Sequence, residues 1–118
     1  MKLEAKQMHF QTLNELIRSA ADPDGEVDHC LGQRYVGAGL SAKHVVLHGT
    51  PGNALAAYLN GATIVVDGNA QDATGDTMNG GEVVIHSNAG DATGYAMRGG
   101  KIFVEGSIGY RAGIHMKA

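Results

Sequence analysis

The chain has 118 residues and a formal net charge of −3, and it carries no basic stripe, which argues against nucleic acid as a partner. It contains 18 glycines, no tryptophan and only 5% aromatic residues, so a core built from large side chains is excluded. The single cysteine excludes an internal disulfide, and the chain shows neither a secretory leader nor an apolar run of about 20 residues, so we expect a one-domain cytoplasmic protein.

The first predicted element is an α-helix from Thr12 to Ala21. Thr12 and Glu15 have the spacing of a capping box. We expect the helix to end before the turn Asp22–Gly25 and to cover the open strand edge of the structure that follows. Residues 1–25 are therefore assigned to this helix and a linker. Its apolar face comprises Phe10, Leu13, Leu16 and Ile17.

Residues 26–42 are predicted to form an irregular first coil of a β-structure that continues to residue 118. Within this coil, Gly37-Ala38-Gly39 is typical of a turn. Arg34 and Tyr35 lie just before that turn. They are candidates for contact with a partner, and anchoring of the first coil is the alternative that the sequence supports equally well.

Residues 43–118 divide into four blocks of 19 residues without a gap. Three consecutive columns of the aligned blocks are β-branched, aliphatic or aromatic, and they predict one short strand in each block. Small and Asx residues follow the strand and favour a turn. The strand columns are Val45, Ile64, Val83, Ile102; Val46, Val65, Val84, Phe103; and Leu47, Val66, Ile85, Val104. A further apolar column holds Leu59, Met78, Met97 and Met116.

This fixed period predicts a solenoid, because 19 residues are too few for the helical repeats of about 33 residues or more. Hairpins are the alternative, but Asn-Gly recurs once per block rather than between every pair of strands. We predict an all-β fold, a single-stranded right-handed parallel β-helix with an N-terminal capping α-helix, whose coils stack at about 4.8 Å. The structural repeat glycines are Gly49, Gly61, Gly68, Gly75, Gly80, Gly94, Gly99, Gly106 and Gly113.

The sixth column of the blocks is a ladder of alternating bases and acids, His48, Asp67, His86 and Glu105. Histidine together with carboxylates is the chemistry of metal sites. Side chains in a ladder point the same way rather than toward a common centre, so we interpret the column as a stack of ion pairs, with a metal site as the alternative.

Other candidate sites are interpreted as structural. Asp72 and Asp91 share a column, but the nine-residue repeat of calcium-binding β-helices is absent from the sequence. Cys30 follows His29, and sequence neighbours rarely form a nucleophile–base pair, so we predict a buried cysteine. Gly37-Ala38-Gly39 lacks the strand–loop–helix context of a dinucleotide site. We therefore assign no catalytic, cofactor-binding or metal-binding residues to this chain.

Residues 27–118 also carry phrases that are specific in both period and composition. They are Gly32-Gln33-Arg34-Tyr35-Val36-Gly37, His48-Gly49-Thr50-Pro51-Gly52-Asn53, Gly68-Asn69-Ala70-Gln71-Asp72, Met97-Arg98-Gly99-Gly100 and Gly109-Tyr110-Arg111-Ala112-Gly113-Ile114-His115-Met116-Lys117. In these phrases the chain resembles the GXGXG domain, the C-terminal β-helix of the glutamate synthase large subunit, and its stand-alone relatives.

The resemblance implies a non-catalytic structural module that packs against glutaminase and FMN-binding synthase domains or subunits and holds their relative geometry. Those modules release ammonia from glutamine and add it to 2-oxoglutarate. FMN and an iron–sulfur cluster would then belong to the partner modules, with no cofactor in this chain.

Two other functions remain as alternatives. The chain is also similar to a non-catalytic subunit of formylmethanofuran dehydrogenase, which is built on the same kind of repeat. A free-standing β-helix enzyme is disfavoured, because acyltransferase coils run in hexads and no clustered groove of acids and bases is visible. Family members usually run several coils further, so we expect the open end coil Gly100–Ala118 to be covered by a further segment, a partner or a second copy.

Overall fold

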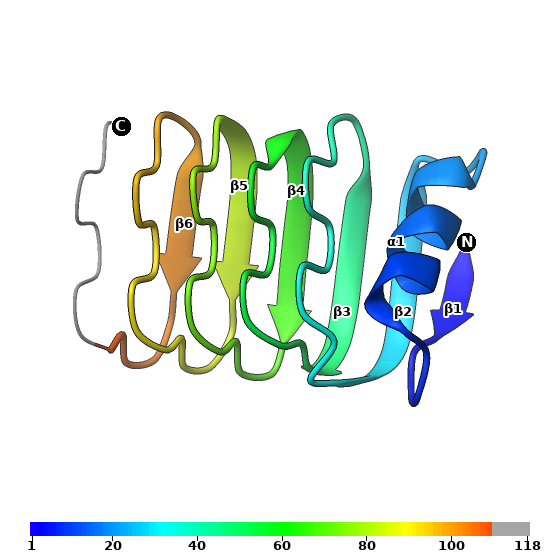
Figure 1. Ribbon diagram of the computed structural model, residues 1–118, viewed down its shortest axis with the longest axis horizontal. Coiled ribbons are helices and arrows are strands. Elements are labelled where there is room, and N and C mark those ends of the chain that lie inside the picture. Colours follow the sequence, from blue (N-terminus) through cyan, green and yellow to red (C-terminus); the bar gives the residue numbers. More distant parts are fainter. Residues whose placement is uncertain (110–118) are drawn as a thin grey trace.

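Six strands form one parallel sheet in which each strand pairs with the next along the chain (Figure 1). This computed structural model describes residues 1–109. Gly113 and most of the last predicted coil lie outside the described residues. The strands are β1 (Lys2–Glu4), β2 (Asp24–Leu31), β3 (His44–Thr50), β4 (Asn60–Asp67), β5 (Gly80–Ile85) and β6 (Lys101–Val104), and the helix is α1 (Phe10–Ser19).

The register between coils confirms the predicted period. Val45 pairs with Ile64, Ile64 with Val83, and Val83 with Ile102, so residues 19 apart lie directly beside one another. All of these pairings are parallel, which excludes the hairpin alternative for β3 to β6. The parallel β-solenoid predicted from the repeat is therefore confirmed.

Alternation along each strand separates a buried face from an outer face. The columns that begin with Val45 and Leu47 point into the core, as does the column of Leu59, Met78 and Met97. The intervening column points outward: Val46, Val65 and Val84 are half-buried, and Phe103 is 50% exposed. The core is thus a narrow stack of aliphatic and methionine side chains, which explains why so few aromatic residues suffice.

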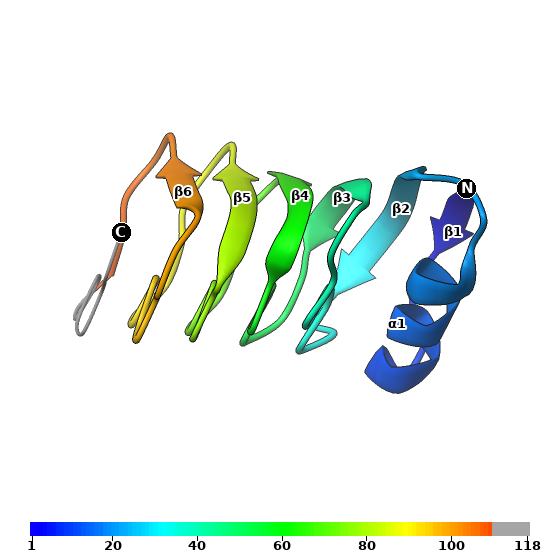
Figure 2. The ribbon, with the colours of Figure 1, turned by 90° about the horizontal axis from the view of Figure 1, so that it is seen from above.

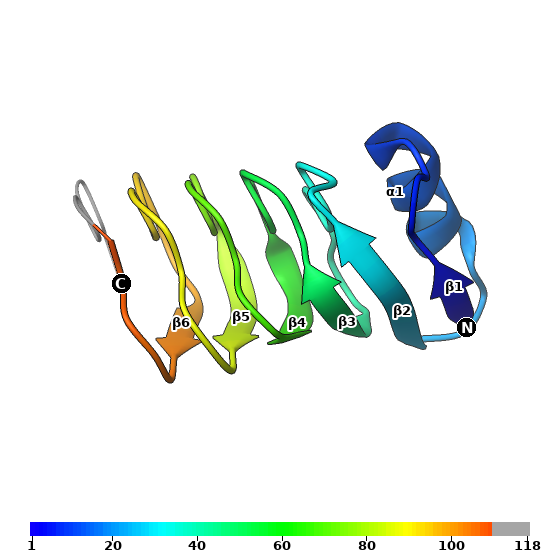
Figure 3. The same ribbon diagram turned by 90° about the horizontal axis from the view of Figure 1, so that it is seen from below.

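A layer of turns forms the side of the solenoid opposite the sheet (Figures 2 and 3). In each turn every second residue is left-handed, and the N–H groups of these residues point alternately to the following and the preceding coil. In one turn Ala54 N donates to Asp72 O and Ala56 N donates to Val36 O, both at 2.8 Å. These inter-coil bonds offset the cost of about 1–2 kcal/mol that a left-handed residue with a side chain carries. The left-handed positions are Tyr35, Gly37, Gly39; Ala54, Ala56, Tyr58; Ala73, Gly75, Thr77; and Ala92, Gly94, Ala96.

The first coil is irregular, as predicted, because its strand contains a bulge. Val27 pairs with Leu47 at a separation of 20 residues, whereas Cys30 pairs with Gly49 at 19. His29, inside the bulge, has a left-handed φ of 57°. The extra residue bends β2 and changes the direction of its outward side chains.

The N-terminal strand β1 was not predicted, and it takes over a role that we expected of the helix. Leu3 of β1 pairs with Val27 of β2, so β1 rather than α1 covers the open edge of that strand. The helix instead closes the end of the core, where Leu13 and Ile17 are fully buried. In Figures 2 and 3, β1 continues the sheet and α1 continues the layer of turns.

The predicted start of the helix was wrong. The helix begins at Phe10, and His9 is its N-cap, since His9 Nδ1 accepts a hydrogen bond from Gln11 N at 3.2 Å. Thr12 therefore lies inside the first turn, and the capping-box spacing of Thr12 and Glu15 is coincidental. The helix also ends at Ser19, two residues before the predicted end at Ala21.

Asn14 on α1 replaces the coil that would otherwise precede the first turn. Gly37 N donates to Asn14 Oδ1 at 2.8 Å, where the equivalent Ala56 and Gly75 donate to a carbonyl of the preceding coil. Asn14 Nδ2 in turn donates to Tyr35 O at 2.7 Å. A single amide side chain thus satisfies the exposed end of the turn layer.

Candidate functional site

Outward side chains at the ends of the strands form the predicted ladder of acids and bases. Strand pairing extends the ladder beyond the four predicted residues: Glu4 of β1 lies beside Asp28 of β2, which precedes His48 in the same column. Toward the other end of the ladder, His86 Nδ1 donates to Glu105 Oε1 at 2.9 Å. The interpretation of the column as paired charges therefore agrees with the contacts seen here.

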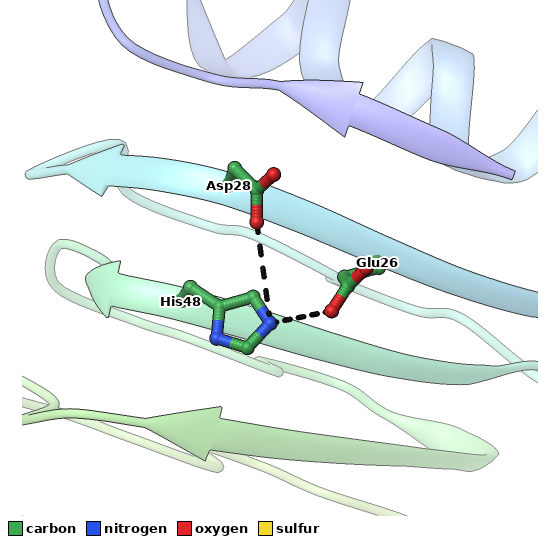
Figure 4. Close-up of side chains that lie close together, drawn as sticks. All are labelled: Glu26, Asp28 and His48. Carbon is green, nitrogen blue, oxygen red and sulfur yellow. Dashed lines mark hydrogen bonds and ion pairs between the residues drawn. The ribbon is translucent and has the colours of Figure 1, made fainter.

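His48 is held between carboxylates on both sides of its ring. His48 Nε2 lies 2.7 Å from Glu26 Oε2 and 4.0 Å from Asp28 Oδ1 (Figure 4). On the other side, His48 Nδ1 lies 3.0 Å from Asp67 Oδ2. A carboxylate oxygen can only accept, so both ring nitrogens donate and the ring carries a positive charge in this arrangement.

The electrostatic environment of the pair follows from these contacts. The pKa of His48 is raised above its ordinary value, first by the hydrogen bond to Glu26 and then by the one to Asp67. The pKa of the Glu26 carboxyl is lowered, chiefly by the hydrogen bond from His48, with Lys2 adding a favourable charge. Each partner thus stabilises the charged form of the other.

These opposite shifts predict a pH window for stability. The His48 contribution is present below its unfolded pKa of about 6.5 and is lost as the pH rises through the higher folded pKa. The Glu26 contribution is present above its unfolded pKa of about 4.5 and is lost as the pH falls through the lower folded pKa. We therefore expect the pair to stabilise the fold most between about pH 4.5 and pH 6.5.

Urea unfolding of the wild type and of the His48→Gln variant, in buffer with a chelator, would measure this effect. The difference between their midpoints should be largest inside the window and should shrink above it. A difference that stays constant between pH 5 and pH 9 would contradict the assigned titration of His48. His86→Gln serves as a control for the loss of a histidine from the same column.

Cys30 is buried with 4% of its surface exposed, as predicted. Burial raises the pKa of its thiol to about 11, and the charge of Asp28 adds to the shift. The thiol is therefore protonated at neutral pH and a poor nucleophile. His29 is exposed, on the other side of the strand, where its ring is paired with Glu4.

Arg34 and Tyr35, the candidates for partner contact, lie against the N-terminal helix. The guanidinium of Arg34 sits 5.3 Å from the ring centroid of Phe10, a cation–π distance. The rings of Tyr35 and Phe10 are 5.6 Å apart. Both side chains retain exposed surface, and Tyr35 is 42% exposed. These contacts support the anchoring role of the two residues.

Asp72 takes part in bonds between coils. Its Oδ1 accepts a hydrogen bond from Asp91 N at 2.7 Å, and its own N donates to Asn53 Oδ1 at 3.0 Å. Asn88 Oδ1 likewise accepts from Ser107 N at 2.8 Å. Asx side chains in these columns tie one coil to the next, a role that the sequence interpretation had given to turns within a coil.

The predicted repeat glycines have different physical roles. One group has a left-handed φ, and in Gly75 an added Cβ would also lie 2.5 Å from Ile102 Cδ1. A second group is close to the neighbouring coil without a left-handed φ, as at Gly106, where an added Cβ would lie 2.6 Å from Ser87 O. Gly80 meets neither constraint, since its nearest neighbour atom would be 3.8 Å away. The first group is Gly49, Gly61, Gly68, Gly75 and Gly94, and the second is Gly99 and Gly106.

Sequence reasoning missed the two carboxylates that share His48 Nε2. Glu26 and Asp28 were assigned to an irregular coil, so neither was aligned with the ladder. Their spacing of two residues in an apolar–polar alternation around Val27 was the available signal, because it places both side chains on one face of a strand.

Comparison with known proteins gives a family match. A family model described as the GXGXG motif matches residues 24–118, a range that starts at the first residue of β2. A search of curated proteins and a search of solved structures each found no match. Within residues 1–109, no helix has the length and hydropathy needed to span a bilayer.

Proposed function

This chain belongs to the GXGXG motif family, and from that membership we propose that it is a non-catalytic docking domain or subunit of a glutamate synthase-like oxidoreductase. The match is consistent with the GXGXG domain of glutamate synthase that the sequence resembles. In this proposal the chain holds a glutaminase module and an FMN-binding synthase module in a fixed relative position. FMN and the iron–sulfur cluster reside in those partners.

The outer face of the sheet is the observation that carries the proposal. Its apolar column, defined as Val46, Val65, Val84 and Phe103, runs across four strands between two columns of polar and charged side chains. An apolar strip with a polar rim is the usual anatomy of a protein–protein interface. A rigid sheet also suits a scaffold, because its strands are bonded to both neighbours along the stack.

A shallow groove runs beside the apolar column and extends the same face. It is lined by the glycines Gly61, Gly81 and Gly100 and by the outward side chains Thr63, Glu82 and Lys101. Glycines bring the backbone to the surface, where its polar groups can bond to a partner chain. The groove and the apolar column together supply an apolar centre and polar contacts.

Binding of purified modules tests the proposal. The full chain, mixed with the glutaminase and FMN-synthase proteins of its source organism, should co-elute with them in size-exclusion chromatography. Phe103→Glu should weaken that complex at least about tenfold, because it places a charge in the centre of the interface. Tyr58→Glu, which changes a side chain 56% exposed in the turn layer, is the matched control and should leave the complex intact.

Two results would contradict the proposal. Co-elution with molybdenum- or tungsten-binding subunits instead would favour the formylmethanofuran dehydrogenase alternative. Turnover of glutamine or another substrate by the isolated chain would contradict a non-catalytic role.

A further inference from the structure

We propose that Glu26, Asp28 and His48 bind one divalent transition-metal ion of the Zn²⁺ class, and that Asp67 positions the His48 ring for it. The inference rests on these four side chains alone and is independent of the proposed docking role. The three ligand residues come from the neighbouring strands β2 and β3 and point toward one spot on the outer face (Figure 4).

The separations between the ligand atoms fit one small cation. One nitrogen and two carboxylate oxygens all lie within 4.8 Å of one another. Tetrahedral Zn²⁺ with bonds of about 2.1 Å sets neighbouring ligand atoms about 3.4 Å apart. The observed distances from His48 Nε2, 2.7 Å to Glu26 and 4.0 Å to Asp28, lie on either side of that value. Small side-chain rotations therefore suffice to close the site.

The strand geometry explains how the three residues meet. Glu26 and Asp28 are two residues apart on β2 and share its outer face, while His48 follows Leu47, the partner of Val27, on β3. The bulge after Val27 bends β2 at Asp28, next to the histidine. Their side chains are 44%, 31% and 34% exposed, so the site is partly shielded yet open to an ion from solvent.

The charge balance favours a dication. Three carboxylates, those of Glu26, Asp28 and Asp67, surround one imidazole. A proton at Nε2 supplies only a single positive charge, and an ion in its place supplies two. Lys2 Nζ, 3.8 Å from Glu26 Oε1, is the other cation at the site, and with 72% exposure it is well screened by solvent.

Asp67 holds the ring in the tautomer that a metal requires. Its Oδ2 lies 3.0 Å from His48 Nδ1, so the Nδ1 proton is directed to Asp67 and the Nε2 lone pair is left for the ion. Metal-bound histidines commonly donate their other N–H to a carboxylate in this way. The repeat places Asp67 there, because it is the residue of the next coil in the His48 column.

The donor set selects the class of ion. Imidazole nitrogen suits Zn²⁺ and its transition-metal neighbours, whereas Ca²⁺ and Mg²⁺ take oxygen ligands. Three protein ligands leave one tetrahedral position, which a water molecule would fill. The site would also tie β2 to β3 at the bulge, where regular strand pairing is interrupted.

Isothermal titration calorimetry of the tag-free full chain with ZnCl₂ tests the proposal. We expect one site of this kind, unaffected by excess MgCl₂. His48→Gln, Glu26→Gln and Asp28→Asn should each lower its affinity at least about tenfold, because each removes a ligand. His86→Gln removes another ladder histidine that lacks the two β2 carboxylates, and it should leave the affinity unchanged.

Asp67→Asn should lower the affinity about 10- to 100-fold as a positioning change. The ¹⁵N shifts of His48 in the Zn²⁺-bound wild type should show metal at Nε2 and a proton at Nδ1, a readout that a merely structural aspartate would not set. Circular dichroism in EDTA checks that each variant is folded, and if His48→Gln unfolds, Glu26→Gln and Asp28→Asn carry the test. Absence of Zn²⁺ binding, affinity unchanged in the ligand variants, or an equal loss in His86→Gln would overturn the proposal.

Discussion

Gly81→Ala is expected to destabilise the solenoid by about 3 kcal/mol or more. Gly81 has a left-handed φ of 96°, and a Cβ added to it would lie 2.3 Å from Ala62 O in the preceding coil. The oxygen belongs to the backbone of a stacked coil, so relief requires the two coils to separate. Urea unfolding followed by circular dichroism would measure the change in the free energy of unfolding.

Gly80→Ala is the matched control for this prediction. Gly80 lacks a left-handed φ, and its nearest atom would be 3.8 Å from the new Cβ. We expect its stability to be unchanged or raised by up to about 1 kcal/mol, because alanine restricts the unfolded chain. Equal destabilisation by the two neighbouring substitutions would show that close stacking at Gly81 is not the cause.

Asn14→Ala is expected to destabilise the fold by about 2 kcal/mol. The substitution leaves the N–H of the buried Gly37 without its acceptor and removes the donor to Tyr35 O. Because coils in a solenoid interact mainly with their neighbours, the first coil should loosen before the rest. Urea unfolding measures the loss, and faster hydrogen exchange at the Gly37 amide would locate it.

Thr12→Ala distinguishes this role of Asn14 from the capping box expected from the sequence. Thr12 is exposed within the helix, so we expect a change within about 0.5 kcal/mol. Asn14→Asp keeps an acceptor for Gly37 and should recover part of the loss. A cost of about 1 kcal/mol for Thr12→Ala would instead indicate an N-cap at that position.

The strand register shows how far prediction from the sequence reached. Val45, Ile64, Val83 and Ile102 were placed in one ladder from their spacing alone, and they are paired as predicted. The buried Cys30 followed from its residue type in the same way. These features depend on period and composition, which any stretch of the chain displays without reference to distant residues.

Contacts between coils at the irregular end were not predictable in this way. The sequence singled out Gly80, whereas the neighbouring coil comes closest at Gly81. Strand β1 is only three residues long and mostly polar, so it carries no alternation that could be recognised. The same irregularity hid the convergence of Glu26 and Asp28 on His48, because the bulge interrupts the 19-residue spacing.

The sequence by itself determined that this chain is a stacked parallel solenoid with an apolar core, because an unbroken repeat allows its equivalent side chains to stack in one arrangement. The tertiary structure alone decided which strand covers the open edge of β2, which side chain closes the first turn, and which carboxylates meet His48. These contacts join segments without a shared period, so they depend on where the folded backbone carries each residue.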